Sequence, residues 1–195
     1  MIMKTFTKIA GALSVNLALT ACSPTLVNLP VAFDQAEAAA LLKPGTNQIA
    51  GTILYEPDQG KVIGAPATYV SCAGRVVTLI PYTDYAREWA LRFYGKPVTD
   101  MAYRLTDRGK SMKFEGEAAF LAASRKTECD EKGNFSFSNV ADGDFLVVAN
   151  VQWMGKYQGY GFGLSQEDMD VEDGSVVKKI SVSGGTRKVL TGPWP

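Results

Sequence analysis

Residues 127–153 read TECDEKGNFSFSNVADGDFLVVANVQW, and this stretch decides the fold. In its second half, 144–153, apolar side chains recur at every other position from Phe145 to Trp153. Successive side chains of a strand point to opposite faces, so this period of two predicts a strand. Residues 134–138 repeat the pattern, with Phe135 and Phe137 on one face and serines on the other. The stretch therefore predicts two strands of a layered β-protein.

Turn-forming residues border both strands. Asp130 is placed to close an Asx-type turn before the first strand, and Gly133 can supply the positive φ that such a turn needs. Asp142-Gly143 predicts the next tight turn, directly before the longer strand.

Working outward, the same periodicity predicts further short strands. They cover residues 48–55, 74–80, 117–128, 176–182 and 186–190. The alanines of 117–128 leave a helix open there, and the last two segments read as a hairpin around Ser183-Gly184-Gly185. About seven strands separated by Gly- and Asp-rich turns predict an all-β antiparallel sandwich.

Two segments are predicted as helices. Residues 83–94 (TDYAREWALRFY) place their aromatic and alanine side chains on one helical face, and Gly95 with Pro97 ends the pattern. Residues 34–43 begin at Asp34, a favourable N-cap, and end before Pro44-Gly45. We expect the apolar face of the 83–94 helix to pack on the sandwich, with a partner groove or a membrane surface as the alternative.

Thr127 to Phe145 carries the pattern T-x-x-D-x-x-G-x-F-x-F-x-x-V-x-x-G-x-F. This resembles the signature hairpin of carboxypeptidase regulatory-like domains, which are transthyretin-like sandwiches of seven strands in Greek-key order. The resemblance implies a sandwich domain over residues 48–191, with 83–94 as an inserted helix, and a non-catalytic role in packing or adhesion. Hydroxyisourate hydrolase, the enzymatic relative, needs histidines, and this chain has none.

The first 22 residues, MIMKTFTKIAGALSVNLALTAC, read as an export signal with Lys4 and Lys8 before an apolar stretch. Leu19-Thr20-Ala21-Cys22 resembles the lipobox of bacterial lipoproteins. The resemblance implies that residues 1–21 are removed and that Cys22 is acylated, with 22–47 as a lipidated tether containing the short helix. Ser23 favours the outer membrane, facing the periplasm or exposed on the cell surface.

Two further cysteines, Cys72 and Cys129, lie in the exported part of the chain. Disulfides persist in oxidising compartments, so we expect a Cys72–Cys129 bridge; two buried free thiols are the alternative. The absence of histidine excludes Ser-His-Asp and Cys-His catalysis and histidine metal sites. Lys+Arg and Asp+Glu balance at 20 each, which gives nucleic acid no basic surface to bind.

One segment has the composition of a binding loop. Residues 153–163 interleave aromatic residues with glycine, and Trp153, Tyr157, Tyr160 and Phe162 are the candidate binding residues. The alternative is that these rings complete the core. The acidic cluster Asp168, Asp170, Glu172 and Asp173 lacks the spacing of a calcium loop, and Arg104, Arg108, Lys110 and Lys113 read as a solvated basic stretch.

These observations predict a non-enzymatic envelope lipoprotein. It is held on the bilayer through acylated Cys22 and acts as a scaffold or protein-binding module for an envelope partner. The alternative is a glycan- or cell-wall-binding accessory module that uses the aromatic loop. We expect no cofactor, no metal and no catalytic residue.

Overall fold

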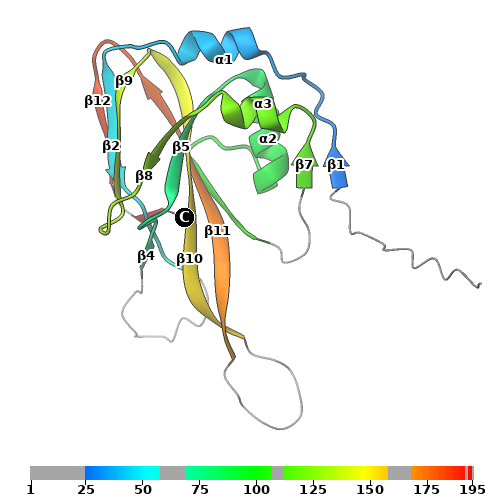
Figure 1. The fold of residues 1–195 in the computed structure, drawn as a ribbon, viewed down its shortest axis with the longest axis vertical. Helices are drawn as coiled ribbons and strands as arrows, with labels where there is room; N and C mark the ends of the chain where they lie inside the picture. Colours follow the sequence, from blue (N-terminus) through cyan, green and yellow to red (C-terminus); the bar gives the residue numbers. More distant parts are fainter. Residues whose placement is uncertain (1–24, 58–68, 107–111, 158–167, 192, 195) are drawn as a thin grey trace, which may run out of the picture.

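The structure is a computed structural model that describes residues 25–57, 69–106, 112–157, 168–191 and 193–194 (Figure 1). It contains thirteen strands and three helices in this described part. They form three layers: a small curved β-layer, a five-stranded sheet, and a layer of short helices with one further strand pair.

The five-stranded sheet is the middle layer. Its strands run antiparallel to their neighbours in the order β6-β11-β10-β5-β8. The bounds are β6 Met101–Leu105, β11 Asp168–Val182, β10 Gly143–Tyr157, β5 Val76–Pro81 and β8 Arg125–Glu128. β10 and β11 pair along their whole length and extend beyond the other strands as a two-stranded ribbon (Figure 1).

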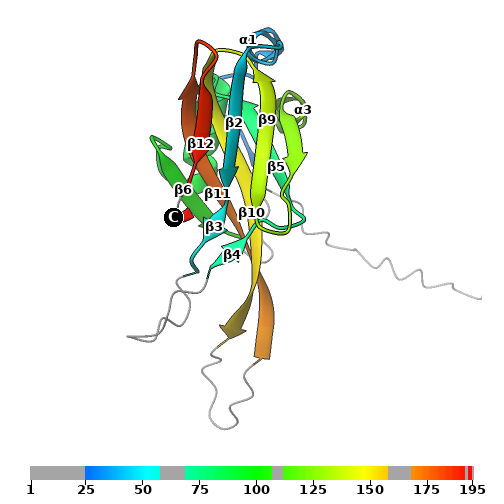
Figure 2. The ribbon, with the colours of Figure 1, turned by 90° about the vertical axis from the view of Figure 1, so that its left-hand side faces the viewer.

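The curved layer covers one face of this sheet, and Figure 2 looks onto it. Its two strand groups are ordered β12-β2-β9 and β13-β3-β4, and only Ile53 separates β2 from β3. The bounds are β2 Asn47–Thr52, β3 Leu54–Tyr55, β4 Val70–Ser71, β9 Asn134–Val140, β12 Arg187–Leu190 and β13 Pro193–Trp194. β12 and β13 run parallel to β2 and β3, whereas β9 and β4 run antiparallel to them.

The helical layer covers part of the other face. It consists of α2 (Asp84–Tyr94), α3 (Glu117–Ala122) and the parallel pair β1 (Thr25–Val27) and β7 (Met112–Phe114). α1 (Gln35–Leu41) lies at one end of the molecule (Figure 1). None of the described helices is long and apolar enough to cross a membrane.

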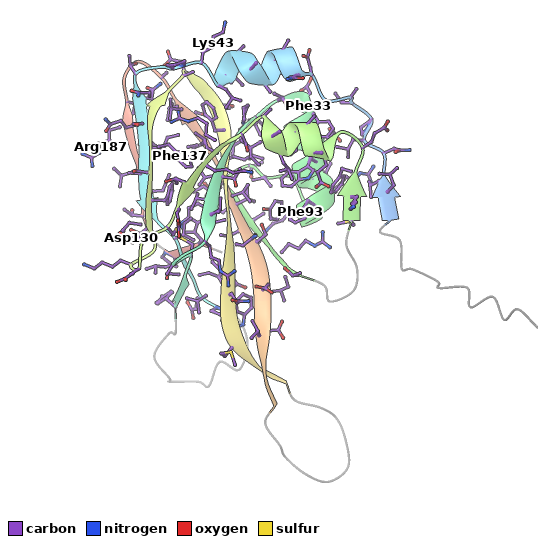
Figure 3. The ribbon with its side chains drawn as sticks, in the orientation of Figure 1. Phe33, Lys43, Phe93, Asp130, Phe137 and Arg187 are labelled. Carbon is purple, nitrogen blue, oxygen red and sulfur yellow. A yellow bond between two sulfur atoms is a disulfide. The ribbon has the colours of Figure 1, made fainter. Side chains whose placement is uncertain are left out.

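Two apolar cores result, one on each face of the five-stranded sheet. The core between the sheets includes Ile49, Phe135, Phe137, Phe145 and Val147 (Figure 3 labels Phe137). The core under the helices includes Ile80, Trp89, Phe120, Leu146 and Val177. β10 supplies both cores because Phe145 and Val147 point to one face and Leu146 to the other, as the alternation predicts.

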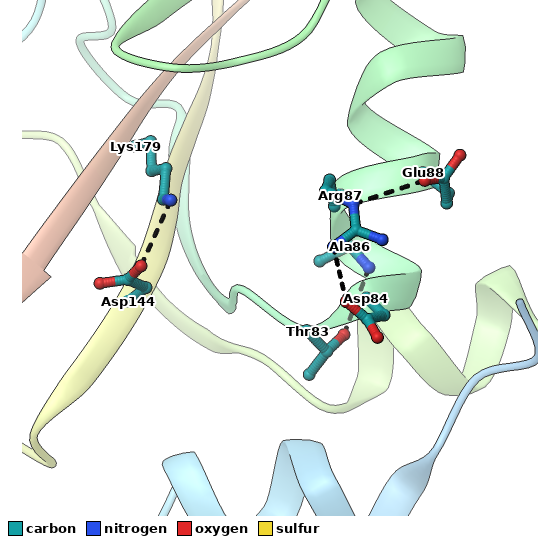
Figure 4. Close-up of polar contacts among 7 residues, drawn as sticks. All are labelled: Thr83, Asp84, Ala86, Arg87, Glu88, Asp144 and Lys179. Atoms are coloured by element: carbon teal, nitrogen blue, oxygen red, sulfur yellow. Dashed lines mark hydrogen bonds and ion pairs between the residues drawn. The ribbon is translucent and has the colours of Figure 1, made fainter.

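α2 confirms the predicted helix and its packing on the sheet. The Thr83 hydroxyl accepts the Ala86 N–H at 3.2 Å, and Arg87 pairs with Asp84 at 2.6 Å on the exposed side (Figure 4). Gly95 ends the helix at φ 71°, a conformation that glycine adopts without strain. α1 also forms as predicted, with the Asp34 carboxylate accepting the Ala36 N–H at 2.8 Å.

The predicted turn before β9 forms around Asp130. Its carboxylate accepts the backbone N–H groups of Lys132 and Asn134, each at 2.8 Å, and Gly133 has φ 79°. The hydrogen bonds from Asn134, chiefly from its side chain, hold the pKa of Asp130 below its usual value.

The Cys72–Cys129 disulfide forms, with 5.8 Å between the Cα atoms. Cys72 directly follows β4 in the curved layer and Cys129 directly follows β8 in the five-stranded sheet. The bridge therefore ties the two sheets together covalently. At the opposite end of β8, Arg125 donates to the backbone carbonyl of Asn139 at 3.0 Å and also to that of Ser138, which joins the same two sheets at one edge.

Several predictions about strand pairing were wrong. The described part has thirteen strands rather than seven, and it includes parallel pairs. The expected hairpin of 176–182 with 186–190 does not form: β11 pairs with β10 and β6, whereas β12 pairs with β2. Gly184 and Gly185, at φ 64° and 77°, instead turn the chain from one sheet to the other. Periodicity predicts that a segment is a strand, but it carries no information about its partner.

Two other segments differ from the expected elements. Residues 117–128 divide into α3 and β8, so the alanines favour a helix over half of the segment. Residues 22–47 are expected as a lipidated tether that contains a short helix. Within this range β1 pairs with β7, and Phe33, labelled in Figure 3, packs its ring 5.5 Å from that of Tyr85 and 5.9 Å from that of Phe120.

Removal of the disulfide should destabilise the fold. We expect Cys72→Ala combined with Cys129→Ala to lower the free energy of unfolding by about 3–4 kcal/mol, because the unfolded chain loses a constraint over 57 positions. Urea denaturation measures the change. Wild-type protein in reductant should show the same loss, and an unchanged midpoint in the double variant would contradict the role assigned to the bridge.

The fold should lose stability in alkali through Tyr85. Burial, with Glu117 and Glu115 nearby, raises the pKa of its phenol to about 12, against roughly 10 in an unfolded chain. The folded state therefore favours the neutral phenol. The contribution of Tyr85 to the free energy of unfolding is complete below pH 10 and is lost between pH 10 and 12. Thermal unfolding across that window should show a smaller decline for Tyr85→Phe than for the wild type; equal declines would contradict this.

Candidate functional site

The outer face of the five-stranded sheet is divided into a covered and an open half. The covered half is apolar: Leu146, Val148 and Val177 lie in or against the core under α2. Further along the same strands, Asn150 and Gln152 take the same face and are exposed. No described element packs on this second half. The change from apolar to polar side chains on β10 therefore marks where the helical layer ends.

Four polar side chains of the open half, Arg75, Asn150, Gln152 and Asp173, form what we call the polar face; the exposed Val76 of β5 lies on the same side of the sheet. Gln152 of β10 is directly opposite Asp173 of β11 in the antiparallel register. Arg75, which precedes β5, donates from its guanidinium to the Gln152 side-chain oxygen. The polar face thus draws on three adjacent chain segments supported by a paired sheet, so its backbone is rigid.

The border with α2 is fixed by two polar contacts. Tyr94, near the end of α2, makes a 2.9 Å hydrogen bond with the hydroxyl of buried Ser175 on β11. Burial raises the pKa of Tyr94 well above its usual value, so the phenol stays neutral. On β6, Arg104 donates to the Phe93 carbonyl at 3.1 Å and covers the Phe93 ring at 4.9 Å from its centroid.

An apolar pair lies next to the polar face. Met154 and Val171 are opposite one another on β10 and β11, two positions beyond Gln152 and Asp173 and on the same face. Their side chains are 55% and 43% exposed. Polar groups and exposed apolar surface thus lie side by side on the protruding ribbon.

This arrangement suits binding of a polyhydroxylated ligand. Amide side chains both donate and accept hydrogen bonds, carboxylates accept, and guanidinium groups donate in a fixed plane. Residues two apart on a strand are about 6.8 Å apart and neighbouring strands about 4.8 Å, so the polar face spans an area comparable with a sugar ring. In the described part of the chain, no three His, Cys, Asp or Glu side chains cluster closely enough to hold a metal ion.

The predicted aromatic loop is only partly described. Trp153 is 7% exposed and faces the core between the sheets, with its ring 5.3 Å from that of Tyr55. Its ring therefore completes the core, and it is not presented on the polar face. Tyr160 and Phe162 lie outside the described residues, as does the side chain of Tyr157, whose backbone ends β10.

The other charged clusters do not converge on one site. Glu172 and Asp173 are consecutive on β11 and so point to opposite faces, while the side chains of Asp168 and Asp170 are outside the described part. Arg104 lies on β6 and Lys113 on β7; Arg108 and Lys110 are not described. Cys22 is also outside the described residues.

Comparison with known proteins gives one informative likeness. No protein-family model matches the chain, and no curated protein matches it. Among solved structures, it is similar to PA1324 of Pseudomonas aeruginosa, described as a "putative carbohydrate binding protein". The two share 20% sequence identity with a TM-score of 0.54, over 84% of this chain and 99% of that one. At this identity the likeness concerns the fold alone.

The hydrogen bond between Tyr94 and Ser175 should contribute measurably to the packing of α2 on the five-stranded sheet. We expect Tyr94→Phe to lower the free energy of unfolding by about 1–3 kcal/mol, because it leaves the buried Ser175 hydroxyl without its partner. Adding Ser175→Ala should recover part of that loss. Urea unfolding of the two single variants and the double variant measures the coupling; strictly additive effects would contradict it.

Proposed function

We propose that this chain is a carbohydrate-binding module of the bacterial envelope, which binds its glycan without catalysis. The observation that carries the proposal is the open polar face on β10 and β11. Asn150, Gln152, Asp173 and Arg75 offer donors and acceptors to sugar hydroxyls, and Met154 with Val171 offers apolar surface to sugar C–H groups.

The scaffold supports this function. Sites on paired strands are held more precisely than sites on loops. The first half of β10 has a core on each face, and Val151 and Trp153 anchor the part that carries the polar face in the core between the sheets. The likeness in fold to a protein described as carbohydrate-binding points in the same direction. It supports the glycan-binding alternative better than a scaffold for a protein partner.

We further propose that the module is a lipoprotein anchored through Cys22. The export signal and the lipobox-like residues 19–22 support this. The anchor would place the module on the outer membrane, facing the periplasm or exposed on the cell surface. The transthyretin-like assignment suggested by residues 127–145 accords with the layered β-structure and stays a proposal.

Retention on immobilised glycans tests the function. Purified protein is passed over peptidoglycan and over a panel of polysaccharides, and the dissociation constant for any retaining glycan is measured by calorimetry. We expect Gln152→Ala and Asp173→Ala each to weaken binding about tenfold, which corresponds to one lost hydrogen bond to a polar ligand.

The matched control is Ser136→Ala with Ser138→Ala. Both serines are exposed on β9, on the curved layer rather than on the polar face. This control should bind as the wild type does, and circular dichroism should show that all variants fold. If no glycan retains the wild type and one protein co-purifies after cross-linking in cells, the protein-binding scaffold replaces this proposal.

A third set of variants distinguishes binding at the polar face from binding at the aromatic segment 153–163. Tyr157→Ala, Tyr160→Ala and Phe162→Ala remove the rings that the sequence marks as a binding loop. If retention depends on these rings and not on Gln152 or Asp173, the glycan binds beyond the polar face.

A further inference from the structure

The segment that follows the lipidation signal is built into the domain. β1 begins at Thr25 and pairs with β7 in register from Thr25↔Met112 to Val27↔Phe114. The Val27 carbonyl accepts the Glu115 N–H at 3.1 Å. Val27, Leu29 and Phe33 then pack against the core under the helices. The described part of the domain therefore begins only three residues after Cys22.

That spacing limits how far the domain can stand from its anchor. Three residues span at most about 11 Å between the Cα atoms of Cys22 and Thr25. A domain of this size has a radius of gyration of about 16 Å, and hence a diameter near 40 Å. With such a short connection the domain cannot turn over freely, so the side that carries Thr25 stays close to the bilayer.

The surface around Thr25 suits contact with lipid. Leu26 is 64% exposed, and its partner in the parallel register is the exposed Lys113 of β7. Leu121 of α3, which follows β7 closely in the chain, is a further exposed apolar side chain. Leucines can enter the headgroup region, and a lysine can bury its alkyl chain while its ammonium reaches a lipid phosphate.

We propose that the side formed by β1, β7 and α3 lies against the membrane that holds the Cys22 lipid. The inference rests on the lipid anchor of the proposed function and does not depend on glycan binding. β1 and β7 cover the same face of the five-stranded sheet that bears the polar face (Figure 1). The polar face is thus turned toward the membrane that carries the anchor.

Lysine labelling tests this orientation with native residues. The lipoprotein is reconstituted into phosphatidylcholine vesicles, floated on a gradient and treated with a water-soluble amine-reactive ester. Mass spectrometry then gives the labelling rate of each lysine. We expect Lys113 to label at least about threefold more slowly than in a variant with a flexible insert of about 20 residues after Pro24, which allows a mean reach of roughly 25 Å.

Lys43 and Lys188 are the internal controls. Both are exposed and lie away from β1, at the end of α1 and on β12. Their labelling rates should be the same with and without the insert. If the protein floats but Lys113 labels equally in both forms, the orientation is overturned. If the protein does not float with vesicles, the anchor fails and the orientation fails with it. Neither result bears on glycan binding, which is measured separately.

Discussion

The fold depends on one constraint: β10 is apolar on both faces over its first half, so the sheet that contains it must be covered on both sides. The curved layer buries Phe145, Val147 and Val151, while α2 and its neighbours bury Leu146 and help to cover Val148. At Asn150 and Gln152 only the face toward the curved layer remains apolar. The helical layer ends there, and the sheet presents polar side chains to solvent.

Features set by local chemistry could be predicted from the sequence. The alternation of 144–153, the helix ended by Gly95 and the Asp130 turn each depend on residues within a few positions of one another, and all three form. The disulfide could be predicted because the export signal read from residues 1–22 implies an oxidising compartment, in which Cys72 and Cys129 are expected to pair. The resemblance of residues 127–145 to a sandwich hairpin pointed toward a mostly β-fold, and that coarse assignment is confirmed.

Features set by distant partners could not be predicted. The parallel pairing of β12 with β2 joins residues more than 130 positions apart, and no local signal specifies it. Buried Asn47 is a similar case: its side chain binds Val140, Asp142 and Thr186. Trp153 looked like a ligand-binding ring because its neighbours include glycines, but its position in the alternation placed it in the core. The polar face did leave a signal in the sequence: at alternate positions of β10, the apolar residues Leu146 and Val148 are followed by the polar residues Asn150 and Gln152.

Arg125 has a consequence for how the protein behaves at high concentration. Its guanidinium occupies the carbonyl oxygens of Ser138 and Asn139 on β9, an edge strand of the curved layer. Free carbonyls on an edge strand are a template for strands of other molecules, and a charged side chain placed on them blocks that pairing. The contact that joins the two sheets thus also protects this end of the edge strand against pairing with strands of other molecules.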